Sequence, residues 1–267
     1  MNGNLLKLLT AFFCCPFAFL SCGMDVVYYI YPSTVTYNVP VITSANYSDP
    51  ASNYESAYFS FKTEEDSNDE YGSCTFLGTG VYYKIYNNYS KMNSDISTIA
   101  SKISSTSEAS AASYIIESLK YQPLACSGTN DSPLIKSEGM NRQVYIRLTN
   151  YNEDTNPLFA ARVLVGNGCE KGESAAGVQN LGRPLRAYGK NLNFDFGRKY
   201  TSGSNSGNYV VPESVDDDVS YSSASSSGVW YVALYAIGVA RDESYTTIYS
   251  NALHLGAVGI SQNYENN

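Results

Sequence analysis

The chain contains a single histidine, His254, and this limits the nucleophilic chemistry that it can perform. A Ser-His-Asp arrangement would need that imidazole as its general base, and no Gly-x-Ser-x-Gly motif surrounds any serine. Leu253 and Leu255 flank the histidine, so in a strand the two leucines would share one face and the imidazole would take the opposite, exposed face. We therefore expect no catalytic residue and a non-enzymatic protein.

Two acidic clusters are the candidates for a metal site. Carboxylate oxygens suit Ca²⁺, but neither cluster has the spacing of a DxDxDG calcium loop, so we interpret both as solvated loop charge. Glycoside hydrolysis would need two carboxylates roughly 5 to 10 Å apart in a cleft, and a sequence cannot place such a pair. We expect no metal and no cofactor, and a lipid-anchored hydrolase acting on cell-wall or glycan material is the alternative function. The clusters are Glu64, Glu65, Asp66, Asp69 and Glu70, and Asp216, Asp217 and Asp218.

Three cysteines follow residue 22, namely Cys74, Cys126 and Cys169. Three cannot all pair with one another, so either one disulfide forms and leaves one thiol, or all three are small buried hydrophobic residues. No Cys-x-x-Cys motif occurs and no histidine lies near them in the sequence. This spacing disfavours a zinc or redox site.

The segment from Leu8 to Cys22 determines where the rest of the chain is placed. Lys7 precedes 13 uncharged residues (8–20), which are followed by the small residue Ser21 and then by Cys22. This order of charged, apolar and small residues is typical of a secretory signal peptide covering residues 1–21. The apolar run is shorter than the about 20 residues that a membrane-spanning helix needs, and no second hydrophobic segment follows.

The sequence Phe19-Leu20-Ser21-Cys22 resembles the lipobox of bacterial lipoproteins, in a relaxed form similar to that of spirochaetes. A strict lipobox has Leu where Phe19 stands. The resemblance implies cleavage after Ser21, a diacylglycerol on the Cys22 sulfur and an N-linked acyl chain such as palmitate. The protein would then be lipid-anchored in the bacterial cell envelope, with the outer membrane favoured because no Asp stands directly after Cys22. The alternative is an ordinary secretory signal cleaved near Ser21 or Gly23.

The mature chain is acidic and rich in tyrosine. Removal of residues 1–21 removes Lys7 and changes the net charge from −8 to −9. An acidic chain without basic runs is a poor candidate for nucleic-acid binding. The 25 tyrosines outnumber the 10 phenylalanines and the single tryptophan. Tyrosine suits half-buried sheet faces and also adhesive surfaces.

Alternating or continuous apolar runs predict most of the chain to be β-strand. Between them, helical spacing over about 91–121, with Asn88 or Ser90 as cap, predicts two helices inserted among the strands. Ser/Gly-rich segments at 201–208 and 220–227 and loops at 64–70 and 125–140 complete the pattern, and no clear period occurs over 166–189. The predicted strands are 26–31, 35–39, 41–42, 56–63, 79–87, 143–149, 160–165, 229–239 and 248–260, with 191–196 either a short strand or a loop carrying Phe194 and Phe196.

This pattern predicts an all-β, antiparallel β-sandwich over residues 22–267, as one domain rather than two. Residues 230–236, a polar turn at 241–244 and residues 249–253 resemble the last two strands of a fibronectin type III or related immunoglobulin-like domain. Residues 58–61 and 81–86 would be that family's second and third strands. The resemblance covers about half of the chain and rests on strand texture. It departs from the family in length, in the helical insertion and in the long loops of 166–228.

In the strand at 79–87, Val81, Tyr83 and Ile85 are expected to point inward and Tyr82, Lys84 and Tyr86 outward. Exposed tyrosines would form a possible binding face, for which cross-strand packing under the helices is the alternative. We expect a binding, adhesion or structural module of the envelope, held to the membrane by Cys22 and contacting a protein or glycan ligand. The tyrosines of this face are Tyr82, Tyr86, Tyr145, Tyr231 and Tyr235.

Overall fold

The computed structural model describes most of the chain between residues 29 and 261. The described residues are 29–35, 40, 58–69, 74–104, 109–149, 160–169, 172–173, 175–187, 193–197, 211–225 and 228–261. The predicted signal peptide, Cys22, residues 41–42 and the segment 201–208 lie outside them. None of the helices among the described residues is long and apolar enough to cross a membrane.

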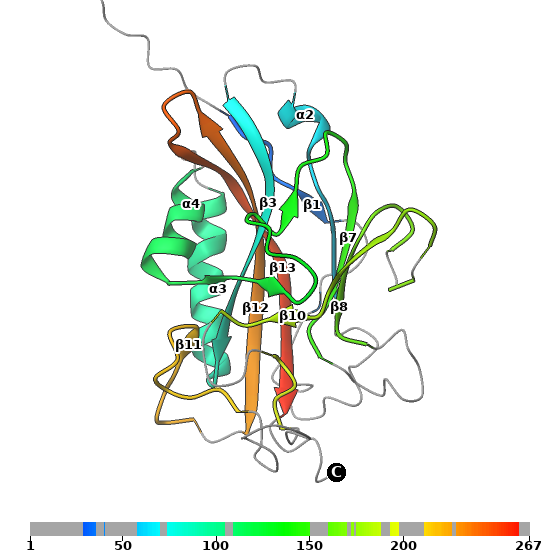
Figure 1. Cartoon of the computed structure of the whole chain (residues 1–267). Coiled ribbons are helices and arrows are strands. Elements are labelled where there is room, and N and C mark those ends of the chain that lie inside the picture. The colour runs from blue at the N-terminus through cyan, green and yellow to red at the C-terminus, as the bar shows by residue number, and fades with distance from the viewer. Residues whose placement is uncertain are drawn as a thin grey trace, which may run out of the picture.

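Two mostly antiparallel sheets pack against each other, and helices cover the outer face of one of them (Figure 1). The first sheet has the order β1-β2-β7-β8-β9. The second is built on β3, β12 and β13, and the second edge of β3 is paired in turn with β6, β4 and β11. The strands of the first sheet are β1 (Thr34–Val35), β2 (Phe59–Lys62), β7 (Gln143–Arg147), β8 (Arg162–Val165) and β9 (Gln179–Gly182). Those of the second are β3 (Cys74–Tyr86), β4 (Gln122–Pro123), β6 (Ile135–Lys136), β11 (Val219–Ser220), β12 (Val229–Asp242) and β13 (Thr247–Ser261), while β5 (Ala125–Cys126) pairs with β10 (Pro184–Leu185).

Strand β12 is buried on both faces, which explains its unbroken apolar sequence. Its even-numbered residues, such as Val232 and Leu234, enter the core between the two sheets, where they join Phe59, Phe61 and Ile146. Its odd-numbered residues face the helices and form a second core. The predicted inward positions Val81, Tyr83 and Ile85 of β3 are all in the first core, and Phe194 and Phe196 are also buried there as the sequence predicted.

The helical layer consists of α3 (Tyr89–Ile103), α4 (Ala109–Ser113) and a π-helical turn at Tyr114–Ser118. Of the two predicted caps, Asn88 and Ser90, the structure has Asn88, whose side chain accepts a hydrogen bond from the Lys91 N–H at 2.8 Å. Ala111 and Ala112 of α4 are fully buried in the core shared with Ala252 and Ala257 of β13. Small side chains on both elements allow the helix to approach the sheet closely.

A bulge interrupts the pairing of β12 with β13. Leu234 lies opposite Gly256 and Tyr235 opposite His254, so Leu255 is the extra residue. Gly256 has a φ of +112°, and a Cβ at this position would come within 2.5 Å of the Pro40 carbonyl oxygen. Only glycine fits this position, where the segment at residue 40 closes onto the edge of β13.

Several sequence predictions of local structure were wrong. Residues 29–31, at the end of the predicted first strand, are not in a strand, and the Tyr31 backbone is bonded to the side chain of Asn68. The predicted acidic loop contains a short helix, α2 (Asp66–Asp69). The segment 125–140, predicted as a loop, contributes β5 and β6, and the segment 166–189 contributes β9 and β10.

Candidate binding site

A cavity of about 360 Å³ opens beside the edge of β3, between β4 and β6. Three separate segments line it: residues 80–82 of β3, much of the segment 123–134, and Leu185 with Ala187. One part of the lining is apolar and includes Pro123, Leu124 and Leu134, whereas the residues 129–132 are polar. A cavity of this size, with a few polar groups on one side, is typical of small-ligand sites.

Backbone pairing shapes the cavity wall. The Leu124 N–H donates to the Val81 carbonyl oxygen at 2.8 Å, and Ile135 pairs with Thr79, so the chain between them loops away from the strand edge. Within that loop the Thr129 hydroxyl donates to an Asp131 carboxylate oxygen at 2.8 Å and accepts from the Asp131 N–H at 3.1 Å. These bonds present the polar side chains of the loop on its exposed side.

A buried ion pair supports the wall that carries Leu185 and Ala187. Arg186 lies between these two residues and donates from Nε and Nη2 to the two oxygens of Asp218, at 2.8 and 2.6 Å. The hydroxyl of Tyr83 donates to Asp218 at 2.7 Å and accepts from the Ala187 N–H at 2.7 Å. Arg186 is 2 % exposed and Asp218 is fully buried. The network therefore ties the segment 185–187 and the segment before β11 to the middle of β3.

Tyr83 and Arg186 both have raised pKa values in this network. Burial raises the pKa of Tyr83 far above its ordinary value, and the nearby Asp218 carboxylate raises it further, so the phenol remains a donor. Burial alone would lower the pKa of Arg186, but its hydrogen bonds and ion pair with Asp218 outweigh burial and raise it. The guanidinium and the phenol hold their protons throughout the physiological range.

The lining of the cavity carries little charge. Burial raises the pKa of Cys126 to about 12 and raises that of Tyr82 well above its ordinary value, so both side chains are neutral at pH 7. Asp131, which is exposed, is the one Asp, Glu, Lys, Arg or His among the lining residues. The cavity offers hydroxyl, amide and carboxylate groups on one side and apolar surface on the other, which suits a neutral ligand of mixed polarity.

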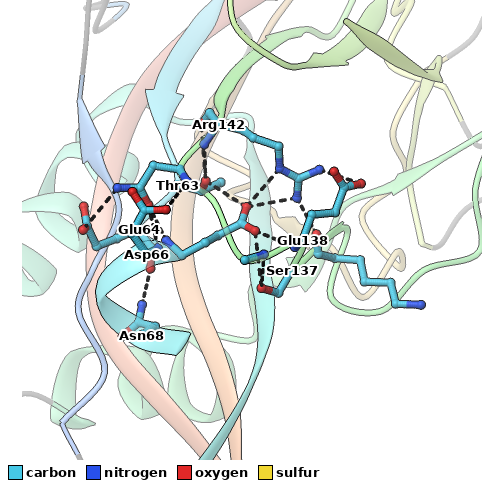
Figure 2. Close-up of polar contacts among 11 residues, drawn as sticks. Thr63, Glu64, Asp66, Asn68, Ser137, Glu138 and Arg142 are labelled. Carbon is cyan, nitrogen blue, oxygen red and sulfur yellow. Dashed lines mark hydrogen bonds and ion pairs between the residues drawn. The ribbon is translucent and has the colours of Figure 1, made fainter. Parts of the chain in front are cut away.

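A second buried ion pair lies at the end of the sandwich that carries α2 (Figure 2). Arg142 donates to Glu65 Oε1 from Nε at 3.1 Å and from Nη2 at 2.9 Å, and Thr63 donates to the same oxygen at 2.9 Å. The Glu138 N–H donates to Glu65 Oε2 at 2.6 Å, and the Glu138 carboxylate pairs with Arg142 at 2.9 Å. Glu65 is fully buried. This cluster fastens the segment 136–142 to the start of α2.

In each acidic cluster the interpretation as solvated charge is thus wrong for one residue, Glu65 in the first and Asp218 in the second. Glu65 and Asp218 are buried because each has an arginine partner, Arg142 and Arg186 respectively. Neither arginine was singled out by the sequence, since each lies more than 30 residues from its partner and in no motif. Among the described residues, no group of three or more His, Cys, Asp and Glu is placed to hold a metal ion.

The predicted tyrosine face is not a surface. Tyr86, Tyr231 and Tyr235 are buried between the second sheet and the helices, which is the packing alternative. Tyr145 is buried on the outer face of the other sheet, where it stacks on Tyr58 at 5.0 Å. Tyr82 alone of the five is only half-buried, and it lines the cavity.

His254 is also not where the sequence predicted. It is half-buried and stacks on Tyr235 at 4.8 Å, because the bulge and the helical layer bring its face of β13 into the second core. Its Nε2 and the Tyr235 hydroxyl find no hydrogen-bond partner among the described residues. Burial lowers the pKa of His254 to about 4, although a backbone hydrogen bond with Gly256 opposes this shift.

Cys74, Cys126 and Cys169 are not in disulfides. Cys126 and Cys169 are buried and Cys74 is half-buried, so the alternative of small buried hydrophobic residues describes them better than a disulfide.

Comparisons of the chain with protein-family models, with curated proteins and with solved structures find no match.

Proposed function

We propose that this chain is a lipid-anchored lipoprotein of a bacterial cell envelope whose β-sandwich is a non-enzymatic binding module. The anchor is supported by the leader sequence and by the Ser21-Cys22 junction. Two or more acyl chains would hold the protein stably at a bilayer, where a single chain is marginal. The cavity beside β3 is the observation that carries the binding role.

The ligand that the cavity suits best is a neutral saccharide. Apolar side chains such as Leu124 and Leu134 can pack against the apolar face of a sugar ring. Asn130 and Asp131, both exposed, offer amide and carboxylate groups to hydroxyls. The lining has no basic side chain that would neutralise a phosphate or carboxylate ligand.

Titration calorimetry of the mature protein with neutral oligosaccharides of envelope glycans tests the binding role. Asn130→Ala and Asp131→Ala should each weaken binding by about tenfold, the loss of roughly 1.4 kcal/mol from one hydrogen-bonding group. Asp217→Ala, an exposed carboxylate that is not among the lining residues, should bind like wild type and is the matched control. An affinity that is unchanged in the two cavity variants would contradict the proposal, and shortened saccharides after incubation would favour the hydrolase.

Metabolic labelling with radioactive palmitate tests the anchor. Wild type should be labelled and should remain with the membrane fraction, whereas Cys22→Ala should be neither labelled nor retained. Protease treatment of intact cells then reports whether the domain faces outward. A mature wild-type protein that is unlabelled and free in solution would end the anchoring hypothesis.

We further propose that the sandwich is a variant of the fibronectin type III and immunoglobulin-like arrangement. The orders β1-β2-β7 and β3-β12-β13 support this, because they match strands A-B-E and C-F-G of that arrangement if β2, β3, β12 and β13 are B, C, F and G. Strands β8 and β9 extend the first sheet beyond β7, and the helices between β3 and β4 would then be an insertion.

A further inference from the structure

The chain enters the described fold at one end of the sandwich. Ile30 is 3 % exposed and packs in a small core with Phe76 and Ala240. The next residue, Tyr31, donates its N–H to Asn68 of α2 at 2.8 Å and accepts from the same side chain at 3.1 Å. Residues 30 and 31 are therefore fixed at the end that carries α2 and the turn between β12 and β13, both at the top of Figure 1.

Two of the most exposed apolar side chains of the described residues lie at this same end. Tyr245, 81 % exposed, is in the β12–β13 turn, and Met140, 60 % exposed, is in the segment that the Glu65–Arg142 cluster fastens to α2. The other large exposed apolar residues, Val211, Val215 and Tyr221, belong to the segment 211–221. Val219 of that segment pairs with Ile85, at the opposite end of β3.

The turn holds Tyr245 in an outward position. Asp242 accepts hydrogen bonds on one carboxylate oxygen from the N–H groups of Ser244 and Thr246, at 2.9 and 2.8 Å. Its carbonyl oxygen accepts from the Tyr245 N–H at 3.0 Å. Tyr245 has a φ of +65°, which is uncommon for a bulky side chain and is imposed here by the closed turn.

The distance to the acylation site is short. Tyr29 follows Cys22 by seven residues, which span at most about 25 Å when fully extended. If Cys22 is acylated, the end that carries Tyr245 and Met140 lies within this reach of the bilayer.

We propose that this end docks on the surface of the bilayer to which Cys22 is attached, with Tyr245 and Met140 in the headgroup region. The inference rests on the proposed lipid anchor. Tyrosine is favoured at the membrane interface because its ring has an apolar body and a polar tip. Acidic residues lie at the same end: Asp66 and Asp69 in α2, Glu138 beside Arg142, and Asp242 and Glu243 at the β12–β13 turn. The surface that this end meets is therefore one of zwitterionic lipid rather than anionic lipid.

Tryptophan quenching in vesicles tests this orientation. The acylated mature protein is reconstituted into phosphatidylcholine vesicles whose acyl chains carry bromine. Trp230, the one tryptophan of the wild-type chain, also emits, so the wild-type spectrum is subtracted from that of each variant. Tyr245→Trp and, independently, Met140→Trp should be quenched about twofold. Tyr221→Trp is the matched control, because Tyr221 is also exposed but lies at the far end of β3, and it should not be quenched.

The outcomes separate the orientation from the anchor. Flotation of every variant with the vesicles shows that the anchor is present. If a variant floats but Tyr245→Trp and Met140→Trp are quenched no more strongly than Tyr221→Trp, the docking surface is overturned and the anchor is not. Protein that does not float overturns both.

Discussion

Arg186 and Asp218 form a bidentate ion pair in the interior of the sandwich, with N···O distances of 2.8 and 2.6 Å. The aspartate also accepts from Tyr83 at 2.7 Å, and the guanidinium lies 5.8 Å from the centre of the Phe196 ring. The pair connects residues 32 positions apart and sets the wall of the cavity. Its removal should therefore affect stability more than any exposed charge on this chain.

Asp218→Ala should lower the free energy of unfolding by about 3 to 5 kcal/mol, because it leaves the buried Arg186 without its main counter-charge and Tyr83 without its acceptor. Urea denaturation followed by circular dichroism measures the loss. Asp217→Ala, at the exposed neighbouring position, should change stability by less than about 0.5 kcal/mol. Equal effects at the two positions would show that the ion pair does not stabilise the fold.

The double variant Arg186→Met with Asp218→Asn separates the cost of an unpaired charge from the loss of packing. It removes the charges at positions 186 and 218, and the asparagine amide introduced at position 218 retains an acceptor for the Tyr83 hydroxyl. The Asp216 carboxylate loses its 2.8 Å bond from Arg186 Nη2 and keeps its bond from the Glu213 N–H. We expect it to recover more than half of the stability lost in Asp218→Ala, since buried ion pairs often contribute little relative to neutral replacements. A double variant as unstable as the single one would indicate that the ion pair itself supplies the stability.

The cap of α3 gives a smaller and more local prediction. Asn88→Ala removes the acceptor of the Lys91 N–H and should cost about 1 kcal/mol. Asn93→Ala, at an exposed position within α3, is the control and should be neutral or slightly stabilising, because alanine has the higher helix propensity. Thermal unfolding of the two variants compares them directly, and a loss at position 93 as large as at position 88 would contradict the role of the cap.

Local patterns in the sequence were sufficient to predict the long elements. β3, β12, β13 and α3 each carry a period or an unbroken apolar run that depends only on neighbouring residues. The short strands β4, β5, β6, β10 and β11 do not, because they exist only through pairing with a distant partner. For the same reason the sequence could place Tyr231 and Tyr235 on one face of their strand but could not predict that this face is buried, because its burial depends on where the helices pack.

The candidate site was not predictable in the same way. Asp218 stood in an acidic run, but its burial depends on Arg186, and nothing near either residue indicates the other. Likewise the cavity is bounded by residues from positions 80 to 187, which come together only in the folded chain. The anchor prediction differs, because a leader peptide is a linear signal and needs no fold.

The thiols give a test of the cysteine assignment. If the leader is removed and Cys22 is acylated as proposed, the protein in denaturant should show three reactive thiols, from Cys74, Cys126 and Cys169, whereas a disulfide would leave one. In the native protein Cys126, which is 5 % exposed and has its pKa raised to about 12, should react slowly with a thiol reagent. Cys74 is half-buried and should react first, which Cys74→Ser would confirm by removing the fast phase.

His254 makes stability depend on pH in a predictable direction. Its pKa is lowered by burial to about 4 in the folded protein, against about 6.5 when unfolded, so between these values the unfolded chain binds more protons. The stability associated with the neutral imidazole is therefore complete above about pH 6.5 and is lost as the pH falls toward 4. From pH 7 to pH 5 the loss of unfolding free energy should be about 2 kcal/mol.

His254→Phe keeps a ring to stack on Tyr235 and cannot be protonated. Over this interval its free energy of unfolding, measured by urea denaturation, should fall by about 2 kcal/mol less than that of wild type. Other groups titrate in both proteins, and only the difference between the two curves reports His254. Parallel curves for wild type and variant would show that the imidazole is not buried in the neutral form.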